Sequence, residues 1–305
     1  MRSYCRFVAV SVVLALVVCL AWAADSPGGR VFRTPQPPAE AQLGDIWVNP
    51  KDGGEMVWVP AGEFLMGSTA AEIAAVIERY SISDIFKWII EAEGPQRKVY
   101  LDGYWIYKCE VTVAQYRKFC KETGREMPEA PAWGWQDNHP MVNVSWHDAV
   151  AYAQLASVSL PTEAQWEKAA RGTDGRSYPW GNRWDAAKCA NSVVKELTST
   201  QPVGSYAAGE SPYGCLDMAG NVREWCADWY DPAYYKHAPT RNPAGPAAAV
   251  RVKVLPGTFS SGARVMRGGS WYLADGGDPF LCAPRGSSAP TSRDDRVGFR
   301  CARTL

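Results

Sequence analysis

The chain has 305 residues, with 32 lysines and arginines balanced by 32 aspartates and glutamates, so its formal net charge is zero. A balanced chain has no broad positive field, which argues against nucleic acid or an anionic membrane surface as a partner. Its length fits one large domain with a sizeable core.

Residues 1–24 have the layout of a cleaved secretory signal. Arg2 and Arg6 precede an apolar run over residues 7–20, and Ala21-Trp22-Ala23 supplies a small-x-small cleavage pattern. The apolar run is too short to predict a membrane span. Cys19 weakly suggests a lipid anchor, but the bulky valine before it disfavours that alternative. We therefore expect export to the periplasm, the cell surface or the medium, without a membrane span.

Residues 25–52 are rich in proline, glycine and polar residues, including Thr34-Pro35-Gln36-Pro37-Pro38. This composition favours an extended linker over packed structure. The folded domain is therefore predicted to cover residues 53–305.

Short strands and two helices are predicted next in the chain. Four segments have apolar residues near period two, which is typical of strands: 56–60, 62–68, 99–101 and 104–106. Between the second and third, four apolar residues follow the spacing of one helix face: Ile73, Val76, Ile77 and Tyr80. A second short helix is expected over residues 84–90.

Three further helices begin at residues that can cap them. Thr112 precedes a helix through Cys120, and Thr162, after a proline, opens a helix over residues 163–170. Ser145 precedes a helix that reaches Leu155, with Asp148 at the reciprocal capping position. Gly172 then ends the last of the three helices.

The chain after Gly172 is predicted to be dominated by loops. Clusters of turn residues separate short apolar runs, without a long periodic segment, at 179–182, 202–205, 213–214 and 242–246. Such a region needs something other than strand ladders to hold it together.

Eleven short segments between residues 55 and 303 resemble, in the same order, those of the formylglycine-generating enzyme (sulfatase-modifying factor) family. Among them are G-E-F-L-M-G-S at 62–68, C-E-V-T-V-A-Q-Y at 109–116, L-P-T-E-A-Q-W-E-K-A-A-R-G at 160–172, D-M-A-G-N-V-R-E-W at 217–225, R-G-G-S-W at 267–271 and G-F-R-C-A at 298–302. The resemblance implies a single α+β domain of the C-type-lectin-like type, rich in loops and poor in regular structure.

The resemblance also implies calcium ions that brace the loops. The implied ligands are the backbone oxygens of Ala219, Gly220 and Val222 with the Glu224 carboxylate at one site, and Asn191 with the Ser192 carbonyl at a second. Calcium prefers six to eight oxygen ligands, which irregular backbone can supply. The alternative for Glu224 is a buried acid paired with an arginine such as Arg223 or Arg267.

Catalytic members of the family oxidise a substrate cysteine with copper that two thiolates hold, because thiolates select Cu(I). The matching positions are Leu273 and either Gly277 or Asp278, and none of these side chains is a soft ligand. Copper is therefore not expected as a cofactor, and whether the chain is an enzyme stays open.

The cysteines also depart from the family pattern. Seven remain after signal removal, so at least one thiol is free or pairs between molecules. Cys282 and Cys301 match structural cysteines of the family, but the positions of their usual partners hold Ala153 and Ala170. The usual disulfides are therefore in doubt.

A binding groove is implied by the same resemblance, lined by Trp225, Ser270, Trp271, Tyr272 and Arg285. Aromatic side chains with an arginine suit a peptide or a sugar, although Trp225 could equally be a plain core residue. We expect a member without copper-dependent oxidation whose groove binds a peptide, a glycan or a partner protein. The alternatives are a diverged oxidoreductase that uses other ligands, acting on sulfatases or secondary metabolites, and a lectin-like display protein.

Overall fold

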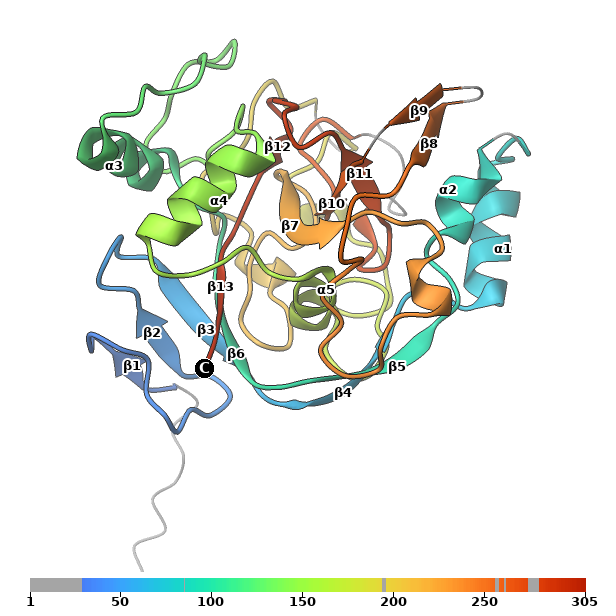
Figure 1. Cartoon of the computed structure of the whole chain (residues 1–305), viewed down its shortest axis with the longest axis horizontal. Coiled ribbons are helices and arrows are strands. Elements are labelled where there is room, and N and C mark those ends of the chain that lie inside the picture. The colour runs from blue at the N-terminus through green and yellow to red at the C-terminus, as the bar shows by residue number, and fades with distance from the viewer. Residues whose placement is uncertain (1–28, 85, 194–195, 256–257, 261, 274–279) are drawn as a thin grey trace, which may run out of the picture.

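The larger of the two main sheets has five strands, in the order β1-β2-β3-β6-β13 (Figure 1). The computed structural model describes residues 29–84, 86–193, 196–255, 258–260, 262–273 and 280–305. The strands of this sheet are β1 (Val31–Phe32), β2 (Ile46–Val48), β3 (Glu55–Val59), β6 (Tyr104–Tyr107) and β13 (Ala302–Thr304). β1 and β2 run parallel, and the other three pairs are antiparallel.

The second main sheet has four strands, in the order β11-β10-β7-β12. They are β7 (Arg223–Trp229), β10 (Arg264–Arg267), β11 (Gly286–Ser288) and β12 (Val297–Gly298). β12 runs parallel to β7, and β10 is antiparallel to both of its neighbours. Two further antiparallel pairs join β4 (Gly62–Met66) to β5 (Arg97–Leu101) and β8 (Val252–Leu255) to β9 (Thr258–Ser260).

Five α-helices lie in the described part of the chain, and three of them begin where the capping residues predicted. They are α1 (Ala70–Arg79), α2 (Lys87–Glu91), α3 (Val113–Thr123), α4 (Trp146–Leu155) and α5 (Glu163–Arg171), with 3-10 turns at Ala186–Lys188, Ala207–Gly209 and Tyr234–Lys236. Thr112, Ser145 and Thr162 each accept a hydrogen bond from a backbone N–H three residues on, in a reciprocal capping box. Gly172, with φ of 73°, ends α5. The predicted caps are confirmed.

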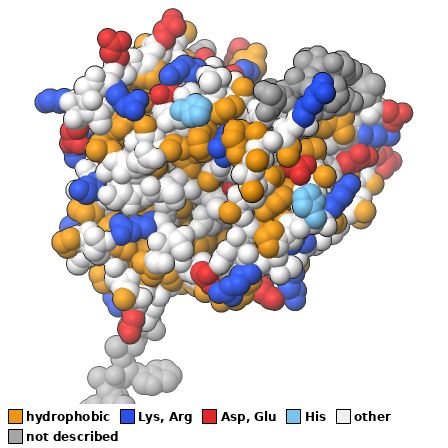
Figure 2. All heavy atoms as spheres, viewed as in Figure 1, with side chains coloured by type: hydrophobic (Ala, Val, Ile, Leu, Met, Phe, Trp, Pro, Cys, Tyr) orange, Lys and Arg blue, Asp and Glu red, His pale blue; other side chains and the backbone are white. Residues whose placement is uncertain are grey.

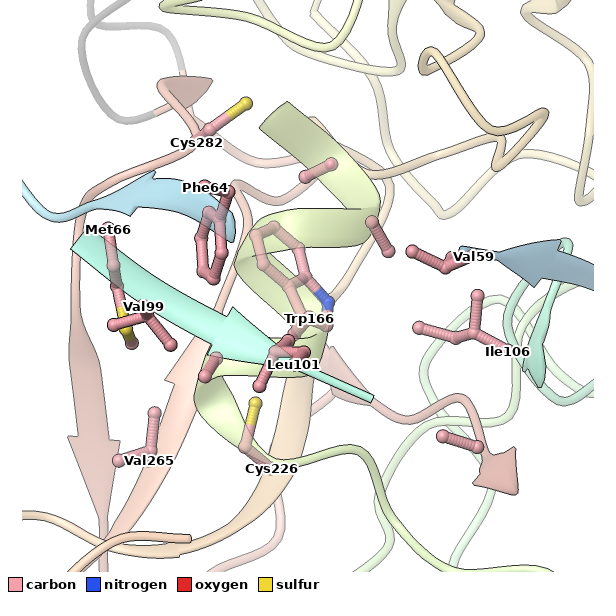
Figure 3. Packing of buried hydrophobic residues seen from close by; sticks show 14 of the residues in the cluster. Val59, Phe64, Met66, Val99, Leu101, Ile106, Trp166, Cys226, Val265 and Cys282 are labelled. Carbon is pink, nitrogen blue, oxygen red and sulfur yellow. The ribbon is translucent and has the colours of Figure 1, made fainter. Parts of the chain in front are cut away.

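The core surrounds α5, which lies between the sheets in Figure 1. Trp166 of α5 is fully buried and points among side chains from β4, β5 and β10 (Figure 3). A second cluster lies under α3 and α4, where Tyr116, Tyr152 and Phe299 pack ring against ring. Short strands, short helices and long irregular connections confirm the predicted α+β class.

The packed chain begins earlier than the sequence suggested. β2 lies within the region expected to be a linker, and its Trp47 is fully buried against Trp105 of β6. The Asp45 carboxylate forms a salt bridge with Arg30 at 2.5 Å and anchors the approach to that strand. The burial of Trp47 and the pairing of β2 with the sheet stabilise this region. This stabilisation outweighs the preference of the preceding proline-rich residues for an extended, unpacked conformation.

Buried arginine–carboxylate pairs connect the loop-rich half to the helices. All members of these pairs have almost no exposed surface. The pairs are Glu163 with Arg285, Glu167 with Arg171 and Arg267, and Glu224 with Arg300. Since a buried charge is tolerated only when it is paired and hydrogen-bonded, these contacts fix how the irregular segments sit on α5 and β7.

The described surface mixes both signs of charge. Figure 2 shows basic and acidic side chains interspersed over the visible face, as expected for zero net charge. In the part of the chain that the structure describes, none of the helices has the length and apolar character needed to cross a bilayer.

Candidate functional site

A pocket of about 320 Å³ lies over one face of the four-stranded sheet. β7 contributes Arg223 and Trp225, which share a face because alternate strand residues point the same way. Glu224, between them, points to the opposite face and into the core. The remaining lining residues are Met266, Ser270, Leu273, Ser288, Ser292, Arg293, Asp294, Arg296 and Val297. We call this pocket the β7 groove.

The floor of the β7 groove is built by the strand register. Met266 of β10 lies opposite Trp225, and Val297 of β12 lies opposite Arg223. Trp225 is only 1% exposed, and its indole nitrogen donates to the Val144 carbonyl oxygen at 3.1 Å. Trp225 is therefore a core residue, and its edge also reaches the groove.

The segment after β10 forms one wall of the groove. Gly268 has a left-handed φ of 79°, and a side chain on Gly269 would come within 2.3 Å of the Phe280 ring. These two glycines let the chain turn tightly, so that Ser270 is buried and lines the groove. The turn thus positions the hydroxyl that the sequence predicted for this site.

Trp271 and Tyr272 lie beside the groove without lining it. The Trp271 indole nitrogen donates to the Asp295 carbonyl oxygen at 3.2 Å, and its ring packs edge-on against Trp133. Tyr272 is 59% exposed, with the Arg296 guanidinium 5.7 Å from its ring centre. The two aromatic rings therefore form a rim at one end of the groove.

Leu273 brings an apolar side chain to the position that the resemblance assigns to a thiolate. It lines the β7 groove, and its carbonyl oxygen accepts a hydrogen bond from the Ser192 N–H at 2.9 Å. The other proposed thiolate positions, Gly277 and Asp278, lie outside the described residues. The groove wall at Leu273 has no donor atom for a metal.

The seven described cysteines are all reduced, and none lines the β7 groove. Burial raises the pKa of Cys215 to about 11 and those of Cys189 and Cys282 to about 12. These thiols therefore stay protonated at neutral pH and are poor ligands for a soft cation.

Arg285 does not reach the groove. Its guanidinium donates twice to the Glu163 carboxylate, at 2.8 Å each, and is stacked between the rings of Tyr230 and Tyr235. The prediction for this residue is corrected, since Glu163 is buried at the start of α5 and needs a cationic partner.

Arg223 is the groove residue that sequence reasoning assigned to another role. It was considered only as a partner for Glu224, although its spacing from Trp225 places both on one strand face. Its side chain forms no hydrogen bond or salt bridge with any described residue, although its backbone N–H donates to the Arg296 carbonyl oxygen at 2.8 Å. Two other arginines at the rim are paired, Arg293 with Asp148 and Arg296 with Asp294, both at 2.6 Å. The i, i+2 spacing of Arg223 and Trp225 is the sequence signal that could have identified Arg223 as a groove residue.

Glu224 does not fit the predicted role of calcium ligand. Its carboxylate accepts from Arg300 at 2.6 and 2.7 Å and from the Trp166 indole nitrogen at 2.8 Å. Three strong donors leave it little capacity to coordinate a cation. The alternative of a buried acid paired with an arginine describes the site, although the partner is Arg300 and neither Arg223 nor Arg267.

Two other acids, Glu110 and Asp217, lie close to Glu224, and Asp217 Oδ2 accepts a hydrogen bond from the Gly204 N–H at 2.6 Å. Both oxygens of Glu110 and Oδ1 of Asp217 are buried without a hydrogen bond. Burial and then the charge of Asp217 raise the pKa of Glu110 well above its usual value, and burial also raises that of Asp217. Two carboxylates cannot satisfy each other unless a proton or a cation lies between them.

The loop that follows Asp217 offers further oxygens. No hydrogen bond from the described residues reaches the carbonyl oxygens of Ala219, Gly220 or Val222. Gly220 has φ of 91°, and a side chain there would come within 2.2 Å of the Ala190 oxygen. Unused carbonyls in the loop after Asp217, together with three carboxylate oxygens that accept no hydrogen bond, fit the donor set that calcium prefers, with Glu110 and Asp217 as the acids in place of Glu224.

In the second predicted calcium site the Asn191 side chain is engaged, whereas no hydrogen bond from a described residue reaches the Ser192 carbonyl oxygen. The Asn191 amide oxygen accepts from the Val193 N–H at 2.9 Å, and its nitrogen donates to the Ala186 and Cys189 oxygens. Ser192 donates from its hydroxyl to the Trp271 oxygen at 2.8 Å. In the described residues these contacts tie the segment to the wall of the β7 groove.

The comparisons with known proteins agree with this architecture. The family model for the sulfatase-modifying factor enzyme 1-like domain matches residues 43–305. The formylglycine-generating enzyme of Streptomyces coelicolor is 32% identical over 88% of this chain and 95% of that enzyme. The chain belongs to this family. The match begins at residue 43, which agrees with the packing of β2.

Solved structures show the same fold. PvdO from Pseudomonas aeruginosa superposes with a TM-score of 0.68 at 25% identity and covers 87% of this chain and all of PvdO. Treponema denticola variable protein 1 has a TM-score of 0.59 at 22% identity, over 82% of this chain and 95% of that protein. The second likeness concerns the fold alone.

Proposed function

We propose that this protein is an exported member of the family that does not carry out copper-dependent cysteine oxidation and whose β7 groove binds a ligand. The observation that carries the proposal is Leu273, whose apolar side chain lines the groove at the first thiolate position. The buried, protonated cysteines elsewhere support it, because none of them lines the groove.

Calcium has a structural role in the same proposal. Glu110 and Asp217, with the carbonyl oxygens of Ala219, Gly220 and Val222, would hold one ion and brace the loop that leads into β7. The ion would bind the carboxylate oxygens that accept no hydrogen bond in the described residues. Because β7 carries two residues of the groove, a braced loop also fixes the position of Arg223.

The copper proposal is tested on the protein purified without chelator. Elemental analysis is expected to find calcium and no stoichiometric copper, and anaerobic Cu(I) titration against a colorimetric chelator is expected to show no tight binding. When the protein is mixed with a peptide of the pattern Cys-x-Pro-x-Arg, it should consume no oxygen and form no formylglycine. The Streptomyces coelicolor enzyme serves as the positive control. Stoichiometric copper together with turnover would overturn the proposal and favour the oxidoreductase alternative.

A further inference from the structure

Arg223 carries a positive charge that nothing in the described structure neutralises. Its side chain is largely shielded from water on the groove face of β7, and it forms no hydrogen bond or salt bridge. Burial and then the charge of Arg296 lower the pKa of Arg223, and the nearby Asp294 opposes that shift only in part. A half-buried, unpaired guanidinium is costly unless a ligand supplies the anion.

The acids near Arg223 are already engaged. Asp294, which also lines the groove, accepts two hydrogen bonds from Arg296 at 2.8 and 2.6 Å. Asp148 accepts from Arg293 at 2.6 Å and also caps α4. Among the described residues Asp294 offsets the charge of Arg223 only in part, so the groove keeps a cation without an ion-pair partner.

The other groups in the groove complement an anion that is attached to an apolar group. Three hydroxyls, those of Ser270, Ser288 and Ser292, line it together with the apolar side chains of Leu273, Met266 and Val297. Hydroxyls can donate to a carboxylate, and a guanidinium matches its two oxygens in a bidentate pair. The apolar walls suit a small hydrocarbon side chain next to that carboxylate.

We infer that the β7 groove binds a peptide carboxylate adjacent to an apolar residue, with Arg223 as the residue that recognises the anion. The inference rests on the proposed function, because it uses the same groove and deepens it by naming the ligand class. A neutral glycan is disfavoured within the groove, since sugars stack on exposed aromatic faces and Trp225, the aromatic residue that lines it, is only 1% exposed; the exposed Tyr272 lies at the rim. The carboxylate belongs either to a peptide C-terminus or to an internal aspartate or glutamate.

N-acetyl-leucine is the minimal probe, and N-acetyl-leucine amide is the uncharged control. Titration followed by two-dimensional NMR of the tryptophan indole groups is expected to show saturable shifts with the acid. The amide is expected to bind at least about tenfold more weakly, which is the usual value of a hydrogen-bonded charge. Equal binding of acid and amide, or no binding of the acid, would overturn the inference.

Variants separate recognition from folding. Arg223→Gln is expected to remove the preference for the acid, whereas Arg117→Gln, on the exposed face of α3 and paired with Asp137 away from the groove, should keep it. Arg223→Lys keeps the charge but loses the bidentate fork, so the preference is expected to fall several-fold without vanishing. If Arg223→Gln does not fold, the lysine variant still decides, because an unchanged preference there would contradict the role of the guanidinium.

Two peptides distinguish the sources of the carboxylate. Acetyl-Gly-Gly-Leu with a free C-terminus and acetyl-Gly-Leu-Glu-Gly amide present the same chemistry at a chain end and within a chain. Arg223-dependent binding of either peptide supports the inference and identifies the source, and Arg223-dependent binding of a sulfated disaccharide without either peptide overturns it. A negative result in these binding experiments would not change the result expected from the copper titration. The inference about the carboxylate ligand and the proposal about copper can therefore fail independently.

Discussion

Buried charges occur in two different states in this molecule. Around α5 and β7, each buried acid that forms an ion pair has its arginine at hydrogen-bond distance, as in Glu163 with Arg285 and Glu224 with Arg300. In the β7 groove Arg223 forms no ion pair with a described residue, and below the adjacent loop three carboxylate oxygens of Glu110 and Asp217 accept no hydrogen bond. Paired charges hold this fold together, whereas unpaired ones mark where something from outside the chain is expected.

The largest effect is expected from breaking a complete pair. Arg300→Met should lower the free energy of unfolding by about 3–5 kcal/mol, because it leaves the Glu224 carboxylate buried with its main partner removed. Urea denaturation at pH 7 measures the change. The double variant with Glu224→Gln should be less destabilised than Arg300→Met alone, and an equal or larger loss would show that packing, and not charge, sets the cost.

Calcium should stabilise the protein through the unpaired acids. At a calcium concentration about 100 times its Kd, the free energy of unfolding should rise by about 2.7 kcal/mol over the chelated protein. Differential scanning calorimetry with and without chelator detects this shift. Glu110→Gln should abolish the calcium effect, while Glu122→Gln on the exposed face of α3 should retain it. Retention by both variants would remove Glu110 from the site.

A third test uses the pH dependence of Glu93, which is buried and accepts a hydrogen bond from the Ser68 hydroxyl at 2.9 Å. Burial raises its pKa from 4.5 to about 7. Its contribution to stability is therefore fully present below pH 4.5 and is lost as the pH rises to about 7, because the unfolded chain ionises first.

Urea denaturation between pH 4.5 and 7.5 measures this loss. Glu93→Gln should remove a pH-dependent change on the order of 2 kcal/mol from the wild-type profile. Burial also raises the pKa of Asp228 to about 7. In the Glu93→Gln variant, Asp228 should therefore still contribute its own pH-dependent change in stability. A profile with the same slope as the wild type would mean that Glu93 is not the titrating group.

The smallest effect is expected from a purely local contact. Thr112→Ala removes the side chain that accepts the Gln115 N–H at the start of α3, and it should cost about 1 kcal/mol. Thermal unfolding of this variant provides the reference for a contact without buried charge. Thr112→Ser keeps the hydroxyl and should be nearly neutral; a full loss in the serine variant would point to packing of the threonine methyl group.

The features predicted from the sequence are those that depend on residues close together in it. The caps at Thr112, Ser145 and Thr162 lie three residues from their partners, and the fold followed from segments in family order. The partner of Glu224 lies 76 residues away on the chain, so no spacing rule identifies Arg300. The same holds for Arg285, whose pairing with Glu163 spans 122 residues.

The candidate site was predicted in part for the same reason. Ser270, Trp225 and Leu273 occur in or next to a recognisable motif, and all three line the groove. Arg223 was missed as a groove residue because its role depends on which face of β7 meets solvent, and only the sheet order decides that. The start of the packed chain was misjudged because the burial of Trp47 depends on a strand 58 residues further on.

Residues 297–304 connect both main sheets, because β12 pairs with β7, Arg300 binds Glu224, and β13 pairs with β6. Neither sheet can therefore be completed until this stretch has been synthesised. While translation is under way, Glu224 lacks its arginine and the edge of β6 lacks its neighbour, so the growing chain is expected to depend on chaperone protection until its last strand leaves the ribosome.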